Sequence, residues 1–332
     1  MNSQDGGILL SSRIRLARNL KKYPFPNRLT WEESQAQLAE IVDMVHHQKG
    51  FENFRMDILR DMDAVERKKR VEKHLMSMEL LNHYENSAII VDPSEEVSIM
   101  INEEDHIRIQ CIKPGLDLRE AYKRASEIDD MIEDRFEYAF NERLGYLTSC
   151  LTNIGTGMRA SVMMHLPGIT ALGEEKNLID TVSKVGFAVR GVYGEGTDYL
   201  GDIFQVSNQI TLGFNEIEVI EAVENMVLKI IEKEKSAREQ LLKRDRMLVE
   251  DKIYRSYGLL KNARMMNYKE SMKLLSDILL GIDLGIINHI ERDKVRNLMD
   301  NIQPAALQIF YGENMNARER VIRRAKVIRE FL

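Results

Sequence analysis

Residues 87 to 112, "SAIIVDPSEEVSIMINEEDHIRIQCI", decide the fold class of this chain. Apolar and polar residues alternate on both sides of a proline turn, which is typical of paired strands. The short connections between these strands favour an antiparallel sheet. Helical spacing returns in "REAYKRASEIDDMIEDRF" (119–136), and "ASVMMHLP" (160–167) and "IFQVSNQITLG" (203–213) are predicted as further strands. Hairpins interleaved with helices indicate an α+β fold, an antiparallel β-sheet flanked by helices.

The segments on either side are predicted to be helical. Before the strands, residues 28–82 are helix-rich, and "WEESQAQLAEIVDMVHH" (31–47) places Leu38, Ile41, Val42 and Val45 on one face. Residues 217–260 are almost free of Gly and Pro, and their apolar residues recur at helical intervals. The rest of the chain is also helical by pattern, with turns near Gly281, Pro304 and Gly312. We therefore predict a first domain over residues 1–230 and an all-helical C-terminal domain over residues 231–332.

Composition excludes several classes of protein. The chain has 332 residues, of which 44% are hydrophobic and 30% charged, so extensive disorder is not expected. A net charge of -6 provides no general attraction to nucleic acid. Cys111 and Cys150 stand far apart without metal-ligand spacing, which fits a reducing cytoplasm. We find neither a secretory leader nor a stretch long enough to span a bilayer, so no membrane association is expected.

Four separated segments combine arginine or carboxylate with strand ends and loops. They are "SSRIRLAR" (11–18), "INEEDHIRI" (101–109), "NIGTGMRASV" (153–162) and "RGVYGEGTDYLGDIFQVSN" (190–208). Arginine suits a polyphosphate, because its planar fork donates two parallel hydrogen bonds and keeps its charge at any working pH. On a strand, Arg13 and Arg15 would present both guanidinium groups on the same face.

Each segment also has a simpler interpretation. A lone arginine is usually a solvated surface charge, and the glycines of "NIGTGMRAS" can serve a tight turn alone. Cys150 could be a small buried hydrophobe. "INEEDH" could be an acidic turn between strands. It is the joint occurrence of the four segments, and their order, that favours a functional site.

The four segments resemble the phosphagen (guanidino) kinase family, whose members transfer phosphate between ATP and a guanidino nitrogen. The resemblance runs from about residue 10 to residue 216 and rests on "NEEDH", "TNIGTGMRAS", "RGVYGEGT" and "VSNQITLG". Within the family, the chain is most similar to the bacterial protein arginine kinases. The region of resemblance begins almost at the N-terminus, without a leading helical domain, and a helical domain follows it.

The resemblance implies a set of site residues. It implies that ATP, with Mg²⁺, is bound by Ser11, Ser12, Arg13, Ile14, Arg15, His74, Arg108, Arg159, Ala160, Ser161, Val162, Met163, Arg190, Gly191, Val192, Tyr193, Gly194 and Glu195. It further implies catalytic roles for Glu104, Glu195, Arg108, Arg159, Arg190 and Cys150. The segment around His74 is less distinctive, so a surface histidine remains an alternative there.

The implied chemistry needs carboxylates beside the arginines. A free guanidinium is protonated and poorly nucleophilic, so a group must orient it and accept a proton. Glu104 and Glu195 match the family's carboxylates, and we expect Glu104 to be the base. Magnesium would be held chiefly by the nucleotide's own oxygens, because no cage of protein carboxylates is apparent and no protein metal site is expected.

Two positions depart from the family pattern. The family's proline after the reactive cysteine is Leu151 here, which leaves the reactivity of the Cys150 thiol open. In the helical domain, "RVIRRA" is the best match to a phosphoarginine-recognition motif and implies that Arg320 and Arg324 bind phosphoarginine. Val321 replaces the motif's aspartate, so a basic solvated helix end is the alternative there.

The resemblance implies an ATP-dependent protein arginine kinase of the bacterial stress response. It implies as partners arginine-bearing protein substrates that include a heat-shock repressor, a zinc-binding activator protein and a Clp protease system. A homodimer is plausible from the family alone. The alternatives are a kinase of a free guanidino compound and a non-catalytic adaptor that binds phosphoarginine or nucleotide.

Overall fold

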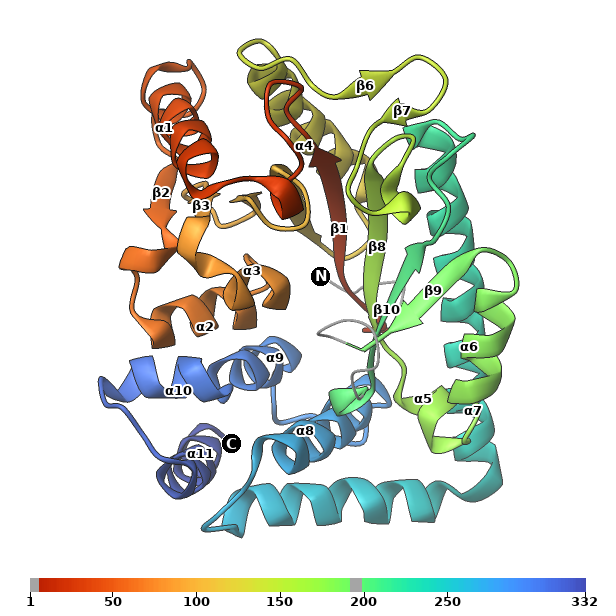
Figure 1. Cartoon of the computed structure of the whole chain (residues 1–332). Helices are drawn as coiled ribbons and strands as arrows, with labels where there is room; N and C mark the ends of the chain where they lie inside the picture. The colour runs from red at the N-terminus through yellow and green to blue at the C-terminus, as the bar shows by residue number, and fades with distance from the viewer. Residues whose placement is uncertain (1–5, 192–198) are drawn as a thin grey trace.

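The computed structural model describes residues 6–191 and 199–332 (Figure 1). Its main sheet has the order β2-β3-β4-β5-β1-β8-β10-β9, and every neighbouring pair is antiparallel. The strands are β1 (Leu9–Arg18), β2 (Arg55–Ile58), β3 (Ala88–Val91), β4 (Val97–Ile101), β5 (Ile107–Pro114), β8 (Met158–His165), β9 (Phe187–Arg190) and β10 (Ile203–Asn208). A separate hairpin pairs β6 (Phe140–Asn141) with β7 (Gly145–Tyr146). The predicted antiparallel sheet flanked by helices is confirmed.

The helices lie at the faces and edges of this sheet. They are α1 (Trp31–His47), α2 (Ala64–Glu72), α3 (Met78–Asn82), α4 (Leu118–Glu133), α5 (Pro167–Ala171), α6 (Glu175–Ser183), α7 (Glu216–Asn262), α8 (Tyr268–Asp283), α9 (Arg292–Asn301), α10 (Pro304–Tyr311) and α11 (Ala317–Phe331). Short 3₁₀ turns are η1 (Pro26–Arg28), η2 (Leu59–Asp61), η3 (Tyr84–Asn86), η4 (Leu151–Asn153) and η5 (Leu200–Asp202). Among the described residues, no helix combines the length and the apolar character that crossing a membrane requires.

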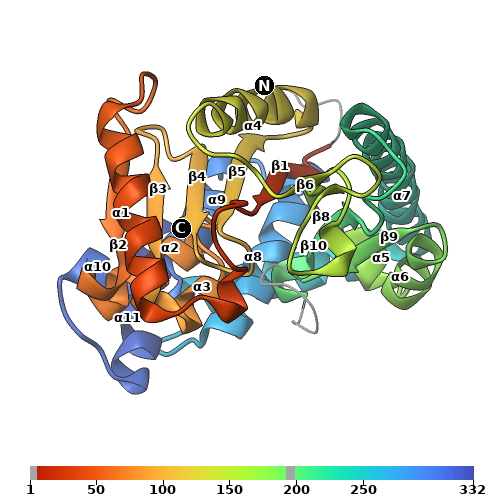
Figure 2. The same ribbon diagram turned by 45° about the horizontal axis from the view of Figure 1, so that its top comes forward.

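The two faces of the sheet differ in chemistry because side chains alternate along each strand. On β1, Ile14 and Leu16 are buried among the side chains of α4, and on β8 Val162 joins the same core. Figure 2 shows α4 lying over β1 and β5 on this side, with α7 beside it. The opposite face carries Arg13 and Arg15 and is only partly covered. The site is therefore expected on that face.

The first predicted helix begins where its sequence indicates. Thr30 is the N-cap of α1, and a reciprocal pair of hydrogen bonds with Glu33 forms a capping box. The buried face differs by one position from the predicted one, since Met44 is buried whereas Val42 is only half-buried. The helix-rich prediction for residues 28–82 also overlooked β2, the edge strand of the sheet.

The C-terminal region is connected to the sheet-containing half of the chain through α7. The large hydrophobic core ends with Ala237, and a second core begins with Ile253. Between them, Asp245 interrupts the helical backbone, and the cyan part of α7 turns beneath the sheet toward α8 (Figure 1). The predicted boundary near residue 230 lies within α7, and as a domain boundary it stays a prediction.

Candidate active site

A cleft of about 1310 Å³ opens on the polar face of the sheet. Its inner wall holds four of the predicted arginines, and its rim includes the loop between β4 and β5, the loop before β8, and α3 with η3. The residues from the predicted set that line it are Arg15, Glu104, Arg108, Cys150, Arg159 and Arg190. Segments up to 175 positions apart in the sequence, from Arg15 to Arg190, thus meet at one place.

The strand register brings the arginines together. Arg15 lies opposite Arg159 across the β1–β8 pair, and Arg108 lies on β5, the other neighbour of β1. Arg13 is two residues before Arg15, so its side chain leaves the same face. Arg190 ends β9 at the edge of the sheet. The row of positive charge therefore runs across β5, β1 and β8 and ends at β9.

Two of these arginines are held by polar neighbours on β10. Arg13 donates from Nη2 to Oε1 of Gln205 at 2.7 Å, and Arg159 donates from Nη2 to the hydroxyl of Ser207 at 3.1 Å. Both acceptors lie on β10. We did not predict Gln205 and Ser207 as site residues, although the alternation of "IFQVSN" could have found them, because it places both on one face.

The arginines also repel one another. Burial, followed by the charges of Arg108 and Arg159, lowers the pKa of Arg13 to about 9. Burial likewise lowers the pKa of Arg15 well below its ordinary value, and the charge of Arg13 adds to this effect, while Glu103 opposes it. The Nε of Arg15 is buried without a hydrogen-bond partner among the described residues. This arrangement favours a bound polyanion, which would supply the missing negative charge.

Three consecutive acidic residues follow β4 and face this positive row. Glu103 accepts hydrogen bonds from both Arg108 and Ser77 and is almost completely buried. Asp105 accepts from Nδ2 of Asn19 at 2.6 Å and from the backbone N–H of Ser149 at 2.7 Å. These two carboxylates therefore build the site and fix the adjacent loops.

Glu104, the middle acid, is exposed in the cleft, whereas Glu103 and Asp105 are held by the contacts given above. Partial burial raises the pKa of Glu104, and the charges of Asp105 and Glu103 raise it further. A hydrogen bond with Cys150 and the charge of Arg108 act in the opposite direction. A carboxylate with a raised pKa accepts a proton more readily than an ordinary glutamate. The raised pKa fits the predicted base, and this role of Glu104 stays a prediction.

Cys150 lies beside this carboxylate at the start of η4. Its Sγ contacts the hydroxyl of Thr152 at 3.0 Å, and the thiol lines the cleft rather than the core. Leu151, which stands at the family's proline position, is 82% exposed. The alternative of a buried small hydrophobe is therefore wrong for Cys150, and its role in the reaction stays a prediction.

The predicted nucleotide-binding residues form two groups, according to the face of the sheet on which their side chains lie. Ser11, His74 and Met163 line two smaller cavities, of about 190 and 80 Å³, and Ser161 lines the smaller one. Burial and the charge of Arg13 lower the pKa of His74 to about 4, so its imidazole is neutral near pH 7. His74 borders these cavities, which does not fit the alternative of a plain surface histidine.

Four other predicted nucleotide residues turn their side chains away from the cleft. Ile14, Ala160 and Val162 are fully buried in the core behind the sheet. Ser12 is also buried there, where its hydroxyl donates to the carbonyl of Gly115 at 2.7 Å. The reason is the period of two along β1 and β8, which places alternate members of a contiguous motif on opposite faces. Their side chains do not line the site.

The last predicted segment is only partly described. Gly191 is buried directly after β9. Val192, Tyr193, Gly194 and Glu195 lie outside the described residues, so the second predicted carboxylate has no structural placement. Among the described residues, no group of three or more His, Cys, Asp or Glu side chains is arranged to hold a metal ion.

The two arginines of the C-terminal motif are held by backbone carbonyls. Arg324 is 3% exposed and donates to the carbonyls of Ile302 at 2.8 Å and Met266 at 3.3 Å. Arg320 donates to the carbonyl of Met315 at 2.5 Å. Arg324 is therefore not a solvated residue at a helix end. Phosphoarginine binding by this pair stays a prediction, and these contacts support a structural role.

Comparisons with known proteins agree with this geometry. Residues 37–237 match the family model "ATP:guanido phosphotransferase, C-terminal catalytic domain", and residues 246–332 match "Protein-arginine kinase McsB C-terminal domain". The chain is 46% identical to the protein-arginine kinase of Caldanaerobacter subterraneus subsp. tengcongensis, over 99% of this chain and 98% of that protein. It is also 46% identical to the protein-arginine kinase of Bacillus subtilis, over 99% of this chain and 91% of that protein.

Solved structures show the same fold. A duplicated taurocyamine kinase from Schistosoma mansoni, with bound transition-state-analogue components, superposes with a TM-score of 0.63 at 26% identity, covering 70% of this chain and 33% of that one. A lombricine kinase superposes with a TM-score of 0.61 at 24% identity, covering 70% of this chain and 67% of that one, which supports the fold alone.

Proposed function

Because the chain belongs to the ATP:guanido phosphotransferase family, we propose that it transfers the γ-phosphate of ATP to the guanidino group of arginine side chains in proteins. One observation carries this proposal: arginines from four strands converge on a cleft that Glu104 also lines. The protein-arginine kinases that match this chain do so over nearly its whole length.

The arginine row would hold the triphosphate. Arg13, Arg15, Arg108, Arg159 and Arg190 would neutralise its charge and that of the migrating phosphoryl group. Mg²⁺ would enter with the nucleotide, bound mainly by phosphate oxygens, and would neutralise further charge. The repulsion among the guanidinium groups supports this assignment, because the negative charge of a bound triphosphate would relieve that repulsion.

Glu104 would act on the acceptor. Its carboxylate would bind the incoming guanidinium and direct one nitrogen toward the γ-phosphorus. As that nitrogen–phosphorus bond forms, the bond from phosphorus to the oxygen of the ADP leaving group breaks, and the nitrogen's proton passes to Glu104. Glu195 would hold the other edge of the guanidinium, and Cys150 would contribute at the same place through its hydrogen bond with Glu104.

The cleft favours a protein side chain over a small free substrate. It extends from the arginine row past Glu104 to α3 and η3, so its volume of about 1310 Å³ far exceeds that of one guanidino group. Asn82, Glu85 and Asn86 on this outer part would contact the polypeptide around the modified arginine. A kinase of free arginine would not need this extension.

The experiment compares acceptors. The enzyme is incubated with Mg-ATP and either an unstructured arginine-rich protein or free arginine, and products are identified by mass spectrometry at neutral pH. We expect phosphoarginine on the protein, lost after acid treatment, and little product from free arginine. Equal or faster phosphorylation of free arginine would contradict the protein-substrate proposal.

Two variants complete the test. Glu104→Gln should lower the rate of transfer by about 10²- to 10⁴-fold, the usual contribution of a general base. Glu66→Gln, on the exposed surface of α2, is the matched control and should leave the rate unchanged. Full activity in Glu104→Gln would exclude this residue as the base.

The role of the protein in the cell is proposed from the family resemblance. We extend the proposal to a cytoplasmic enzyme of the bacterial stress response that can form a homodimer. Its partners would be arginine-bearing proteins that include a heat-shock repressor, a zinc-binding activator protein and a Clp protease system. These assignments rest on family resemblance, and affinity purification from stressed and unstressed cells would test them.

A further inference from the structure

A partly open cavity lies between the polar face of the sheet and the C-terminal helices. Its volume is about 190 Å³, and on the sheet side it is lined by Ser11, His74 and Met163. A smaller neighbouring cavity shares these three residues and reaches Arg13. The opposite wall comes from α8, from α9 and from the residue just before α10. The two halves of the chain therefore line this cavity together.

Its position along β1 fixes its relation to the arginine row. Ser11, Arg13 and Arg15 leave the same face of β1 at every second position, so Ser11 and Arg15 are about 13 Å apart along the strand. Arg15 lines the large cleft that Glu104 also lines, whereas Ser11 lines the cavity of about 190 Å³. A nucleotide whose γ-phosphate lies near Glu104 and whose phosphates lie on Arg15 and Arg13 must place its nucleoside at the Ser11 end.

We propose that α8 and α9 form the second wall of the nucleoside pocket, so that the C-terminal domain itself positions the purine and ribose of ATP. This inference rests on the proposed function, because it takes the arginine row as the triphosphate site. It assigns Met272, Arg296 and Gln303 to nucleotide binding. Matches to the catalytic-domain family model end at residue 237, before all three of them.

The chemistry of the helical wall suits a purine nucleoside. Met272 and Met299 offer flexible apolar surface opposite Met163, and thioethers pack well on aromatic rings. Arg296 can lie against the face of the base or donate hydrogen bonds to it. Gln303 carries both a donor and an acceptor, which the edge of an adenine also presents. The pocket thus combines apolar walls with a few polar groups, as small-ligand sites generally do.

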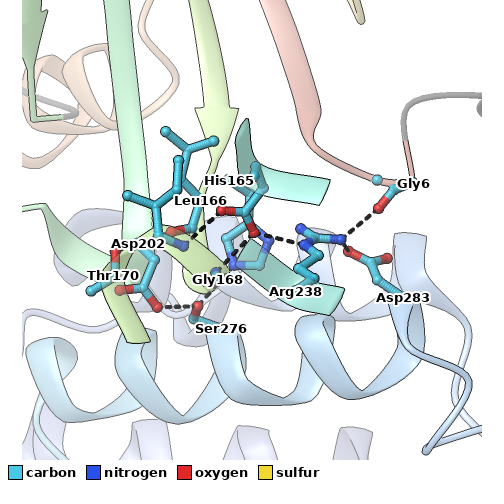
Figure 3. A network of polar contacts seen from close by, with 12 residues as sticks. Gly6, His165, Leu166, Gly168, Thr170, Asp202, Arg238, Ser276 and Asp283 are labelled. Carbon is cyan, nitrogen blue, oxygen red and sulfur yellow. Dashed lines mark hydrogen bonds and ion pairs between the residues drawn. The ribbon is translucent and has the colours of Figure 1, made fainter. Parts of the chain in front are cut away.

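Hydrogen bonds hold this wall against the sheet. Figure 3 shows His165, at the end of β8, beside Ser276 of α8, with Nε2 and Oγ 2.8 Å apart. The same hydroxyl donates to Oδ2 of Asp202 at 2.6 Å. On the α9 side, Arg296 donates from Nη2 to the carbonyl of Leu10 at 3.3 Å, next to Ser11.

A second part of the network joins α7 to α8. Glu234 accepts the backbone N–H groups of Gly168 and Ile169 and a hydrogen bond from Arg238, and Arg238 reaches Asp283 of α8 (Figure 3). All three charged side chains are buried. The wall is therefore a fixed part of the molecule, which is what a positioning surface requires.

The first test uses the unmodified full chain. A photoreactive ATP analogue with an azide on the purine ring is bound and irradiated, and the labelled peptides are mapped with and without excess ADP. We expect ADP-protected label within residues 268–303. Label confined to residues before 238 would overturn the inference and leave the proposed function intact. Failure of the chain to bind ATP at all would instead overturn the proposed function, and this inference with it.

The second test separates nucleoside from phosphate contacts. Titration calorimetry measures the dissociation constants of ADP and of inorganic triphosphate for Arg296→Ala, with Lys294→Ala, an exposed neighbour on α9, as the matched control. We expect Arg296→Ala to weaken ADP about five- to tenfold and to leave inorganic triphosphate unchanged, as loss of one base contact would do. Unchanged ADP affinity, or an equal loss for both ligands, would overturn the assignment. If Arg296→Ala does not fold, the photolabelling of the unmodified chain still tests the inference.

Discussion

At the scale of single residues, the site concentrates like charges that the fold alone would disfavour. Arg13 and Arg15 lie on one strand, with Arg108 and Arg159 on its two neighbours, and each guanidinium is partly removed from water. The lowered pKa values of Arg13 and Arg15 mean that the folded state disfavours their charge relative to the unfolded chain. The free protein should therefore gain stability when one of these charges is removed.

Arg15→Met tests this trade between stability and function. At neutral pH we expect the melting temperature of the nucleotide-free variant to rise by about 1–2 °C, which corresponds to about 1 kcal/mol for a chain of this size. Phosphoryl transfer should be lost, because a donor to the triphosphate is missing. Differential scanning calorimetry checks the first result, and a lowered melting temperature would contradict the account of charge repulsion.

The pH dependence of the reaction reports on Glu104. In the proposed mechanism the carboxylate form of Glu104 is the base, so activity should fall as pH decreases through the pKa of Glu104. Burial and two acidic neighbours raise that pKa above the ordinary 4.5, and the acid limb of kcat/KM should therefore lie above pH 4.5. The residual activity of Glu104→Gln should lack this limb. A midpoint at or below 4.5 in the unmodified enzyme would show that another group controls the profile.

At the scale of elements, the turn before β8 sets the position of the Cys150 loop. Gly155 has a φ of +114°, and a Cβ there would stand 2.5 Å from the carbonyl oxygen of Thr211. Thr211 in turn donates its hydroxyl to the carbonyls of Thr152 and Ile154. Only glycine permits this close approach, so the glycine turn connects the loop after β10 with η4.

Gly155→Ala should disturb both stability and the site. We expect the free energy of unfolding to fall by about 2–4 kcal/mol, from backbone strain and steric overlap together. Gly173→Ala is the matched control, because its φ of +72° is also positive but no atom lies within 4 Å of the added Cβ. It should cost only about 1 kcal/mol. Urea unfolding measures both, and equal losses would show that the contact with Thr211 is unimportant.

At the scale of the whole molecule, hydrogen bonds join the C-terminal helices to the rest of the chain beside the cavity lined by Ser11 and Gln303. Glu72, at the end of α2, accepts the backbone N–H groups of Ala305 and Ala306 at 2.7 Å each. It thereby caps α10 from the other half of the chain. Gln303 donates back to the carbonyl of Glu72 at 3.3 Å. One side chain thus connects the segment before His74 with the helical wall.

Removing this cap should loosen the junction. Glu72→Ala is expected to reduce the free energy of unfolding by about 1.5–3 kcal/mol, the usual value for hydrogen bonds to a charged group. Hydrogen exchange should become faster at the amides of α10, and ADP should bind more weakly. Glu66→Ala, at an exposed position of the same helix, should change none of these. Unchanged exchange in α10 would mean that the junction is held elsewhere.

The sequence by itself determined the local features of this protein. Alternation predicted the strands and the antiparallel sheet, and helical spacing predicted the helix over residues 31–47. The resemblance supplied the arginines and Glu104. It also included Ile14 and Val162, whose side chains point into the core. The same alternation could have excluded them, because the face of a strand follows from a period of two.

Only the tertiary structure decided which distant segments meet. The order of strands depends on pairings between residues far apart in the chain, and no local pattern specifies that β5, β1 and β8 lie side by side. For the same reason the sequence could not reveal that Arg324 is buried against backbone carbonyls, or that Arg296 and Ser11 line the same cavity. Side-chain periodicity fixes which face a residue occupies, whereas long-range packing fixes what stands opposite that face.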